Sequence, residues 1–151
     1  MALPVVTTIN RTDQSYASRA YSDLSIVSVP PNNPTVRILR TAGQVGTSAV
    51  GSSTSIPASF HEQAKNAFAN VAACLSLGGA TPRDITKITI YVVNFELWMR
   101  EVLVDTITNF FTNDDSQKPH KPPSTLLGVT ALASEDFLIE VEAEAMIAVS
   151  P

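Results

Sequence analysis

Hydrophobic and polar positions along the chain predict several strands and two helices. Short segments rich in β-branched residues and bounded by turn residues are typical of strands. The predicted strands are Leu24–Val29, Val36–Gly43, Ile85–Asn94, Ser124–Leu132 and Phe137–Val149. The segment Pro30–Pro34 is expected to be a turn, because proline cannot donate to a sheet and asparagine tolerates left-handed backbone. Residues 1–20 are polar and aperiodic, and we expect a short strand or a loose arm there.

Two longer segments have apolar residues at the three- and four-residue steps of an amphipathic helix. In Ala58–Gly79 the apolar stripe consists of Phe60, Ala64, Ala67, Phe68, Val71 and Leu75. Ser59 and Glu62 have the spacing of a capping box, and Gly78-Gly79 is expected to end the helix. In Glu96–Phe111 the predicted core residues are Trp98, Val102, Leu103, Ile107, Phe110 and Phe111.

The order strand-strand-helix-strand-helix-strand-strand predicts one α+β or α/β domain over residues 1–151, with a mixed sheet. Two helices can cover only one face of that sheet. Alternation in the last strand sends Glu140, Glu142 and Glu144 to the helix-free face. Flanking apolar residues favour a partly buried subunit interface there. Arg37 and Arg40 on a neighbouring strand are candidate partners of the three carboxylates.

Composition narrows the class of protein. Charged residues make up 16% of the chain, below the roughly 25% of soluble domains, which favours an oligomer. The formal net charge is −4 and the ten lysines and arginines are scattered, so we expect no nucleic-acid partner. No apolar run approaches the roughly 18 residues of a membrane span, and no export signal is recognised. Cys74 is the only cysteine, which favours a reducing compartment, the cytoplasm.

Few residues suggest inorganic or nucleophilic chemistry. The two histidines, His61 and His120, belong to no cluster with metal-ligand spacing, so no metal or other cofactor is expected. Cys74 is expected to be a small core residue. Lys118, His120 and Lys121 form either a solvated loop or a cationic site for a small anionic ligand.

Three segments resemble the Rid family, also called RidA, YjgF or endoribonuclease L-PSP. They are TAGQVG (Thr41–Gly46), the helix-and-strand segment Phe60–Asn94, and Pro122–Ala145. Together they cover most of the chain from Tyr21 onward. The resemblance implies an α+β, chorismate-mutase-like fold with two helices on one face of a mixed sheet. It also implies a homotrimer around a central barrel, with small-molecule clefts between subunits.

The resemblance further implies a chemistry. RidA-type proteins hydrolyse reactive imines and enamines, such as 2-aminoacrylate, to a keto acid and ammonia. In them an arginine holds the substrate carboxylate, backbone amides of a turn assist, and a glutamate activates water. By position, Gly43 matches the amide turn, Glu140 matches the water-activating glutamate, and Tyr21 matches a tyrosine that lines the cleft.

Two positions depart from that pattern. Where RidA proteins have the motif RPARS, this chain has KPPST, so Ser124 occupies the place of the arginine. Val104 stands where an asparagine often lines the cleft. A hydroxyl cannot reproduce the paired hydrogen bonds of a guanidinium to a carboxylate. We therefore expect weak or no hydrolysis of 2-aminoacrylate, although Ser124 can still contact a ligand.

Three functions stay open at this point. The first is hydrolysis of a small imine or enamine through Glu140, which could otherwise be an ordinary outward-facing strand residue. The second is a pathway-specific biosynthetic enzyme acting on a larger or uncharged substrate. The third is a non-catalytic trimer that binds a metabolite or a protein. Ribonuclease activity is disfavoured, because an acidic chain offers RNA few contacts.

Overall fold

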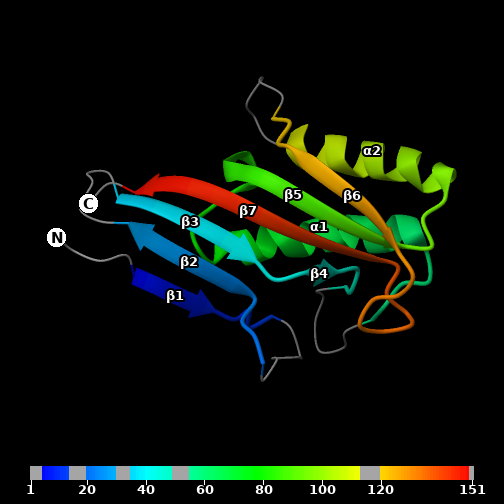
Figure 1. The fold of residues 1–151 in the computed structure, drawn as a ribbon, viewed down its shortest axis with the longest axis horizontal. Coiled ribbons are helices and arrows are strands. Elements are labelled where there is room, and N and C mark those ends of the chain that lie inside the picture. Colours follow the sequence, from blue (N-terminus) through cyan, green and yellow to red (C-terminus); the bar gives the residue numbers. More distant parts are fainter. Residues whose placement is uncertain (1–4, 14–19, 30–34, 49–54, 113–119, 150–151) are drawn as a thin grey trace.

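The computed structural model describes residues 5–13, 20–29, 35–48, 55–112 and 120–149. The turn predicted at Pro30–Pro34 and the side chain of Lys118 lie outside the described residues. The elements, shown in Figure 1, are β1 (Val5–Ile9), β2 (Leu24–Val29), β3 (Thr35–Thr41), β4 (Gln44–Val45), α1 (Phe60–Ser76), the 3-10 turn η1 (Pro82–Asp84), β5 (Ile85–Val93), α2 (Leu97–Thr112), β6 (Ser124–Val129) and β7 (Ile139–Val149).

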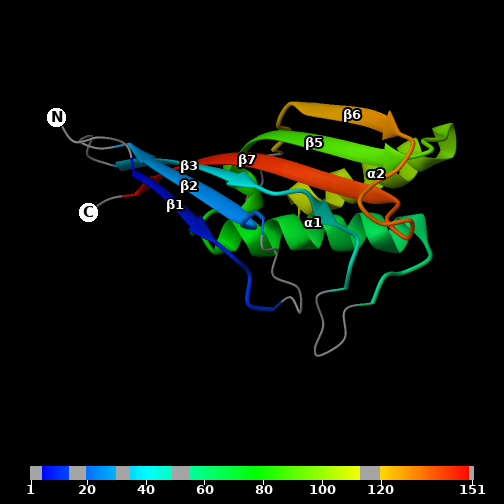
Figure 2. The same cartoon turned by 60° about the horizontal axis from the view of Figure 1, so that its bottom comes forward.

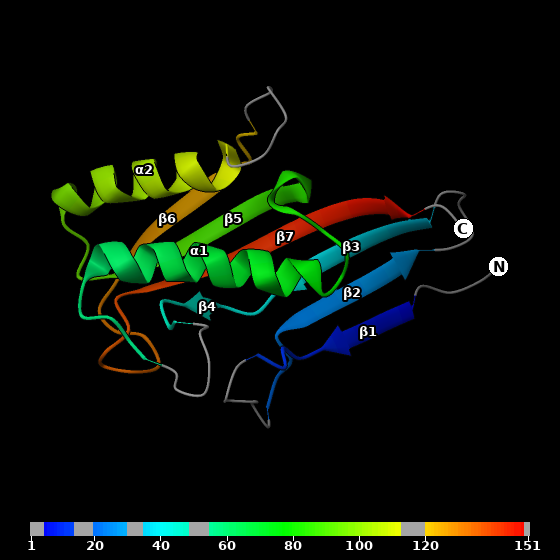
Figure 3. The ribbon, with the colours of Figure 1, turned by 180° about the vertical axis from the view of Figure 1, so that it is seen from behind.

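The strands form one mixed sheet in the order β1-β2-β3-β7-β5-β6, and β4 pairs with β7 beyond the end of β3. Among the described strands, β5 and β6 run parallel, because α2 connects them, and the other pairs are antiparallel. Both helices lie on the same face of the sheet (Figures 2 and 3). The predicted α+β architecture, with two helices on one face, is therefore confirmed.

The core fills the space between this sheet face and the helices. The apolar stripe predicted for the first helix is confirmed, since all six of its members are buried. Ser59 caps α1, its hydroxyl accepting a hydrogen bond from the Glu62 amide at 3.5 Å. The chain leaves the helix through Gly78 and Gly79. Gly79 has a φ of +80°, which side chains rarely adopt, and a Cβ at Gly78 would lie 2.2 Å from the Leu39 side chain.

The prediction for the start of α2 is partly wrong. Trp98 is 52% exposed, whereas Met99 is buried together with Leu103 and Thr106. These three residues follow the three- and four-residue spacing of the face toward the sheet, and Trp98 is rotated off it. The indole instead packs edge-on against Phe60, with ring centroids 5.8 Å apart. Trp98 therefore covers the rim of the core without filling it.

Strands β6 and β7 are shorter than predicted, ending at Val129 and beginning at Ile139. The connection between them is held by Gln63 of α1, whose side chain is almost fully buried. Its amide nitrogen donates to the Asp136 carbonyl at 2.8 Å, and its amide oxygen accepts from the Leu138 amide at 2.9 Å. These contacts satisfy partly buried backbone groups that an extended strand would otherwise pair across the sheet.

Arg11 fastens the N-terminal segment to the rest of the fold. Its side chain is buried, and its guanidinium donates to the Asp13 carboxylate at 2.9 and 2.6 Å. It also donates to the Asn70 side-chain oxygen at 3.1 Å and to the Gln44 side-chain oxygen at 3.5 Å. The Arg11 amide donates to the Asp23 carboxylate at 2.8 Å. One residue thereby joins the segment after β1 to α1, β4 and the segment before β2.

Candidate functional site

Glu140 lies near the start of β7, in the middle of the sheet. It is aligned with Tyr91 of β5 on one side and with Val45 of β4 on the other. Its neighbours Ile139 and Val141 are fully buried against the helices. Because strand side chains alternate, Glu140 points to the helix-free face, where it is half-buried.

The carboxylate of Glu140 rests directly over Gly43, in the turn between β3 and β4. A Cβ built on Gly43 would lie 1.7 Å from Oε1 and 2.4 Å from the carboxyl carbon of Glu140. Any side chain at position 43 would displace the carboxylate, so glycine is required for this approach. The structure thus brings together the two residues that were expected to supply the water-activating group and the amide turn.

The environment of Glu140 disfavours its charged form. Burial raises the pKa of the Glu140 carboxyl above its usual value, and the nearby charge of Glu142 raises it further. Tyr91, aligned with Glu140, donates a hydrogen bond from its hydroxyl to the Glu142 carboxylate at 3.4 Å. Burial, followed by the charge of Glu142, also raises the pKa of Tyr91. A carboxyl with a raised pKa binds and releases a proton more readily near neutral pH.

Arg37 and Arg40 were predicted to pair with the glutamates of β7; the prediction is correct for Arg40 and wrong for Arg37. Arg40 is aligned with Glu144, and their side chains form an ion pair at 3.5 Å. Arg37 is aligned with Ile147, on the face that carries the helices. The two arginines are three residues apart, so they point to opposite faces of the strand, and Arg37 lies away from the carboxylates.

Ser124 lies on the other side of the sheet from Glu140. It begins β6 and is aligned with Ile88, a core residue on the helix-bearing face. There it lines a hollow of about 260 Å³ between α2 and the start of β6. The walls of this Ser124 hollow are largely apolar and include Val104, Ile107 and Phe111. Within one chain, Ser124 and Glu140 therefore cannot line the same cavity.

The loop before β6 contributes one anchored and one exposed group. The His120 ring is held by a 2.8 Å hydrogen bond between Nε2 and the Ile85 carbonyl, and it packs edge-on against Phe111 at 5.4 Å. Lys121 is exposed at the edge of the Ser124 hollow. His120 is thereby occupied in holding the loop, while Lys121 is the cation that borders the hollow.

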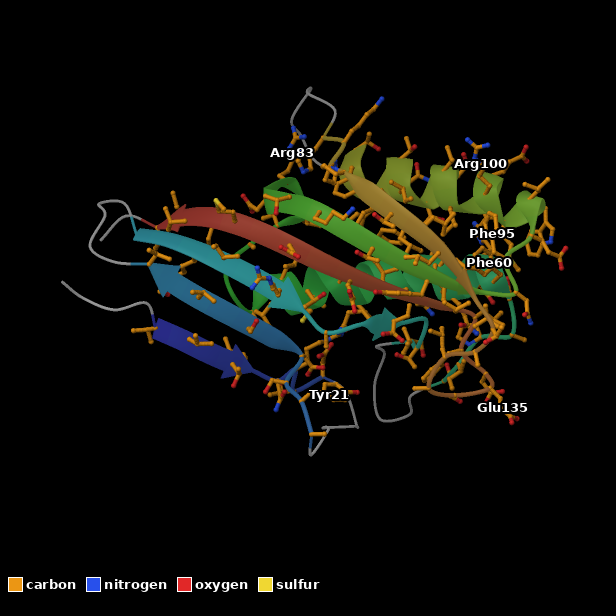
Figure 4. The ribbon with its side chains drawn as sticks, in the orientation of Figure 1. Tyr21, Phe60, Arg83, Phe95, Arg100 and Glu135 are labelled. Carbon is orange, nitrogen blue, oxygen red and sulfur yellow. The ribbon has the colours of Figure 1, made fainter. Side chains whose placement is uncertain are left out.

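Tyr21 lies in the segment that leads into β2 (Figure 4). Its side chain is 57% exposed. Two residues later, the Asp23 carbonyl accepts a hydrogen bond from the Ala42 amide at 2.8 Å. The segment that carries Tyr21 therefore borders the turn that carries Gly43.

Sequence reasoning did not single out Tyr91. The segment ITIYVV is apolar on nearly both faces, so its pattern alone does not show which residue meets the glutamates. The pairing of β5 with β7 places Tyr91 beside Glu140. A tyrosine within an otherwise aliphatic strand is the signal in the sequence that could have drawn attention to it.

The described residues hold no group of three or more His, Cys, Asp or Glu side chains that could bind a metal ion. Cys74 is buried, as predicted, and its thiol donates to the Asp23 carbonyl at 3.0 Å. Burial raises the pKa of this thiol to about 12, so it is not a nucleophile at neutral pH. Among the helices of the described chain, none has the length and apolar character needed to cross a membrane.

Comparison with known proteins places this arrangement in a family. The family model described as endoribonuclease L-PSP matches residues 14–147. The YjgF gene product of E. coli is 26% identical, with a TM-score of 0.71, 92% of this chain and 97% of that chain being covered. E. coli TdcF with bound serine is 23% identical, with a TM-score of 0.71 and coverage of 94% and 100%. YyfA from Yersinia pestis, of the Rid protein family, is 21% identical, with a TM-score of 0.73 and coverage of 95% and 100%. No curated protein matches at a significant level.

Proposed function

Because the chain belongs to the endoribonuclease L-PSP family, the Rid family of the YjgF protein, we propose that it hydrolyses a small reactive imine or enamine. The reaction takes place in a cleft between the subunits of a homotrimer. The observation that carries this proposal is the Glu140 carboxylate, half-buried over Gly43 and with a raised pKa. TdcF, which has the same fold, has been seen with bound serine, and this supports a small amino-acid-like ligand.

The proposed chemistry needs one carboxylate and one water molecule. Glu140 accepts a proton from water as the water oxygen attacks the carbon of the C=N bond. The protonated carboxyl gives this proton to the nitrogen, which forms a carbinolamine. Glu140 then accepts the proton of the new hydroxyl group as the carbonyl forms and passes it to the nitrogen, which leaves as ammonia. An enamine first becomes the imine, gaining a proton on carbon and losing one from nitrogen, and then follows the same route. A carboxyl that is neither strongly acidic nor permanently protonated suits both steps.

Two copies of the chain are needed to complete the cleft. Glu140 and Gly43 lie on the helix-free face, whereas Ser124 lies on the opposite face. The helix-free face also exposes large apolar side chains, among them Val6 (65%), Met146 (49%) and Leu127 (40%). Exposed apolar groups of this kind mark interaction surfaces. The proposed cleft therefore joins the surface around Glu140 and Gly43 of one subunit to the Ser124 hollow of the next.

Assembly is tested by light scattering. The wild-type chain of 16.1 kDa is expected to have three times that mass in solution. Met146→Glu is expected to yield smaller species, because Met146 is exposed in the single chain and would have to be buried as a charge in the trimer. Leu97→Glu is the matched control, since Leu97 is 82% exposed at the start of α2 and should leave the mass unchanged. A wild-type monomer would contradict the proposed cleft.

The lining of the Ser124 hollow favours the second candidate, a substrate larger or less charged than 2-aminoacrylate. Val104, Ile107 and Phe111 present an apolar wall, and among the described residues of the lining, apart from His120, Lys121 is the one with a charged side chain. An apolar wall gains free energy by covering an apolar substituent and gives a carboxylate no paired hydrogen bonds. The preferred substrate is therefore expected to carry an apolar group next to the C=N carbon.

A substitution at Ser124 tests whether the missing guanidinium limits the standard reaction. The wild type is expected to release little keto acid from enzymatically generated 2-aminoacrylate. Ser124→Arg is expected to raise kcat/KM for this substrate by about tenfold or more, because a charged hydrogen-bond pair contributes about 1.5–3 kcal/mol. Ser124→Gln, which adds length without charge, should have little effect. Efficient wild-type turnover that Ser124→Arg does not improve would contradict the argument.

A further inference from the structure

The strand β4 follows the Gly43 turn, yet the sheet holds only a small part of this segment. β4 pairs with β7 over Gln44 and Val45, and among the described strands it has no second neighbour. Its other edge is turned to α1, on the side of that helix away from α2 (Figure 3). The backbone groups along this edge therefore need partners outside the sheet.

Buried polar side chains gather around the segment from Gly43 to Thr47, which we call the β4 segment. Six polar or charged side chains are buried among the described residues, and five of them lie in this segment or against it. The five are Arg11, Gln44, Thr47, Gln63 and Asn70, and the sixth is Thr106 on α2. Burial of a polar group costs free energy unless the group is hydrogen-bonded. Their concentration here indicates that the β4 segment is held in one place.

Asn70 makes the central contacts of this arrangement. Its side-chain nitrogen donates to the Val45 carbonyl and to the Thr47 carbonyl, both at 2.9 Å. These two bonds use both hydrogens of the side-chain amide. The side-chain oxygen accepts a hydrogen bond from the Arg11 guanidinium at 3.1 Å. The Asn70 amide is thus held at both ends.

Two further side chains of α1 hold the same segment. Asn66, one turn before Asn70, donates to the Gly46 carbonyl at 3.2 Å. Gln63 packs so closely on Gly46 that a Cβ on this glycine would lie 2.4 Å from the Cβ of Gln63. Residues three and four positions apart lie on one face of a helix, so Gln63, Asn66 and Asn70 form a single polar row. This row fixes the β4 segment beside β7.

The place of the β4 segment determines how well the Glu140 carboxylate is covered. Val45 is aligned with Glu140, and Gly43 lies directly under the carboxylate. Asn70 is on the helix-bearing side of the sheet and Glu140 is on the other side, so Asn70 acts on the carboxylate through the backbone of the β4 segment. A shift of this backbone would expose the carboxylate to water.

We propose that Asn70 is a positioning residue for Glu140, because it holds the β4 segment so that Gly43 stays under the carboxylate. The inference rests on the proposed hydrolysis, in which Glu140 is the base. It adds that the surroundings this base needs are set from the opposite side of the sheet. Asn70 itself contacts neither the reacting atoms nor the carboxylate.

Asn70→Leu tests this role. Leucine is close to asparagine in size, donates no hydrogen bond and changes no charge. Without their donor, the Val45 and Thr47 carbonyls are expected to turn to water, and the β4 segment shifts with them. The titration of the Glu140 carboxyl carbon is then followed by ¹³C NMR. We expect the pKa of Glu140 to fall toward its ordinary value, because burial is the main cause that raises it.

The charges near Glu140 stay the same in this variant. Among the described residues, the titratable groups beside Glu140 are Glu142 on its own strand and Tyr91 on β5. The β4 segment contributes none. A lower pKa of Glu140 therefore reports its greater exposure.

Turnover gives a second measurement. In Asn70→Leu, kcat for apolar imines is expected to fall about tenfold or more with a smaller change in KM, since a misplacement of about 1 Å can cost about 10²-fold. The acid limb of the kcat/KM profile should move to lower pH together with the pKa measured by NMR.

Val71→Ala is the matched control for stability. Val71 follows Asn70 on α1 and is fully buried, and its truncation leaves a cavity without removing a hydrogen bond to the β4 segment. This variant is expected to unfold more easily while keeping the wild-type Glu140 titration and kcat. Asn66→Ala is a milder second variant, since Asn66 is half-buried and donates one bond to the segment. It should shift the titration in the same direction as Asn70→Leu, but less.

The outcomes distinguish this inference from the proposed hydrolysis. An unchanged Glu140 titration in folded Asn70→Leu overturns the positioning role, and so does an equal loss of kcat in Val71→Ala. If Asn70→Leu does not fold, an unchanged titration in Asn66→Ala overturns it. A lowered Glu140 pKa in a protein that hydrolyses no imine supports the positioning role and contradicts the proposed hydrolysis.

Discussion

Replacing Glu140 with glutamine is expected to lower imine hydrolysis by about 10²–10⁴-fold, the usual contribution of a general acid–base group. Glutamine preserves the shape of the side chain over Gly43 but cannot accept a proton. The measurement is keto-acid release, made with 2-aminoacrylate in the Ser124→Arg background and with apolar imines in the wild-type background. Glu144→Gln is the matched control, because Glu144 is exposed and paired with Arg40, and should retain activity.

The raised pKa of Glu140 adds two expectations about pH. If Glu140 is the base, kcat/KM rises as pH increases through its folded pKa, which lies above the ordinary value of a glutamate. A raised pKa also means that the folded state holds the proton more tightly than the unfolded chain. The resulting stabilisation is complete below the unfolded pKa and is lost as pH rises through the folded pKa. At neutral pH, Glu140→Gln should therefore leave stability unchanged or slightly increased while activity falls.

The same measurements distinguish a catalytic role of this protein from the non-catalytic alternative, in which it only binds a metabolite or a protein. Unchanged turnover in Glu140→Gln would remove Glu140 from the mechanism. A wild-type trimer that binds small metabolites, but hydrolyses neither 2-aminoacrylate nor apolar imines, would favour the non-catalytic alternative. If Glu140→Gln lowers the free energy of unfolding by as much as it raises the activation free energy, the carboxylate has a structural role.

Replacing Arg11 with methionine is expected to lower the free energy of unfolding by about 3 kcal/mol. The guanidinium serves the buried oxygens of Asn70 and Gln44 as well as the Asp13 carboxylate. A hydrogen bond to a charged group contributes about 1.5–3 kcal/mol to stability. Leaving a buried acceptor without a donor costs about 1–3 kcal/mol. Methionine fills part of the volume but donates no hydrogen bond.

Denaturant unfolding at one fixed protomer concentration measures this change, because the proposed assembly would make apparent stability depend on concentration. Arg100→Met is the control, since Arg100 is exposed on α2 and its loss should change stability by no more than about 0.5 kcal/mol. An Arg11→Met protein as stable as this control would show that the Arg11 contacts contribute nothing net. Asp13→Asn should cost less, because the Asp13 side chain is half-exposed.

Local periodicity predicted most of the architecture. The apolar stripe of α1 and the strand alternation of β7 are confirmed, because each needs only one side of an element to be buried. Trp98 was assigned to the core wrongly, since a bulky apolar residue in the first turn of a helix fits either the core face or its rim. Arg37 was assigned to the wrong face. β3 does lie beside β7, but side chains alternate along a strand, so Arg37 and Arg40, three residues apart, cannot both face the glutamates.

Some residues of the candidate site were likewise predicted from the sequence, and others were found only in the structure. The resemblance to Rid proteins pointed to Gly43 and Glu140, and the structure brings the Glu140 carboxylate onto the glycine. The resemblance implied clefts between subunits, but no sequence pattern indicated that Ser124 and Glu140 lie on opposite faces of the sheet. Tyr91 was missed because its position beside Glu140 depends on the register between β5 and β7.

Arg11 shows most clearly where sequence patterns stop. It stands in a polar N-terminal segment that was expected to hold a short strand or a loose arm, yet its guanidinium is buried against residues 33 and 59 positions away. Patterns within the chain determine the helices, the strands and the buried side of each, because these depend on neighbours a few residues apart. Strand register and the partners of buried polar groups were decided only by the tertiary structure, since they depend on contacts between segments that the sequence separates.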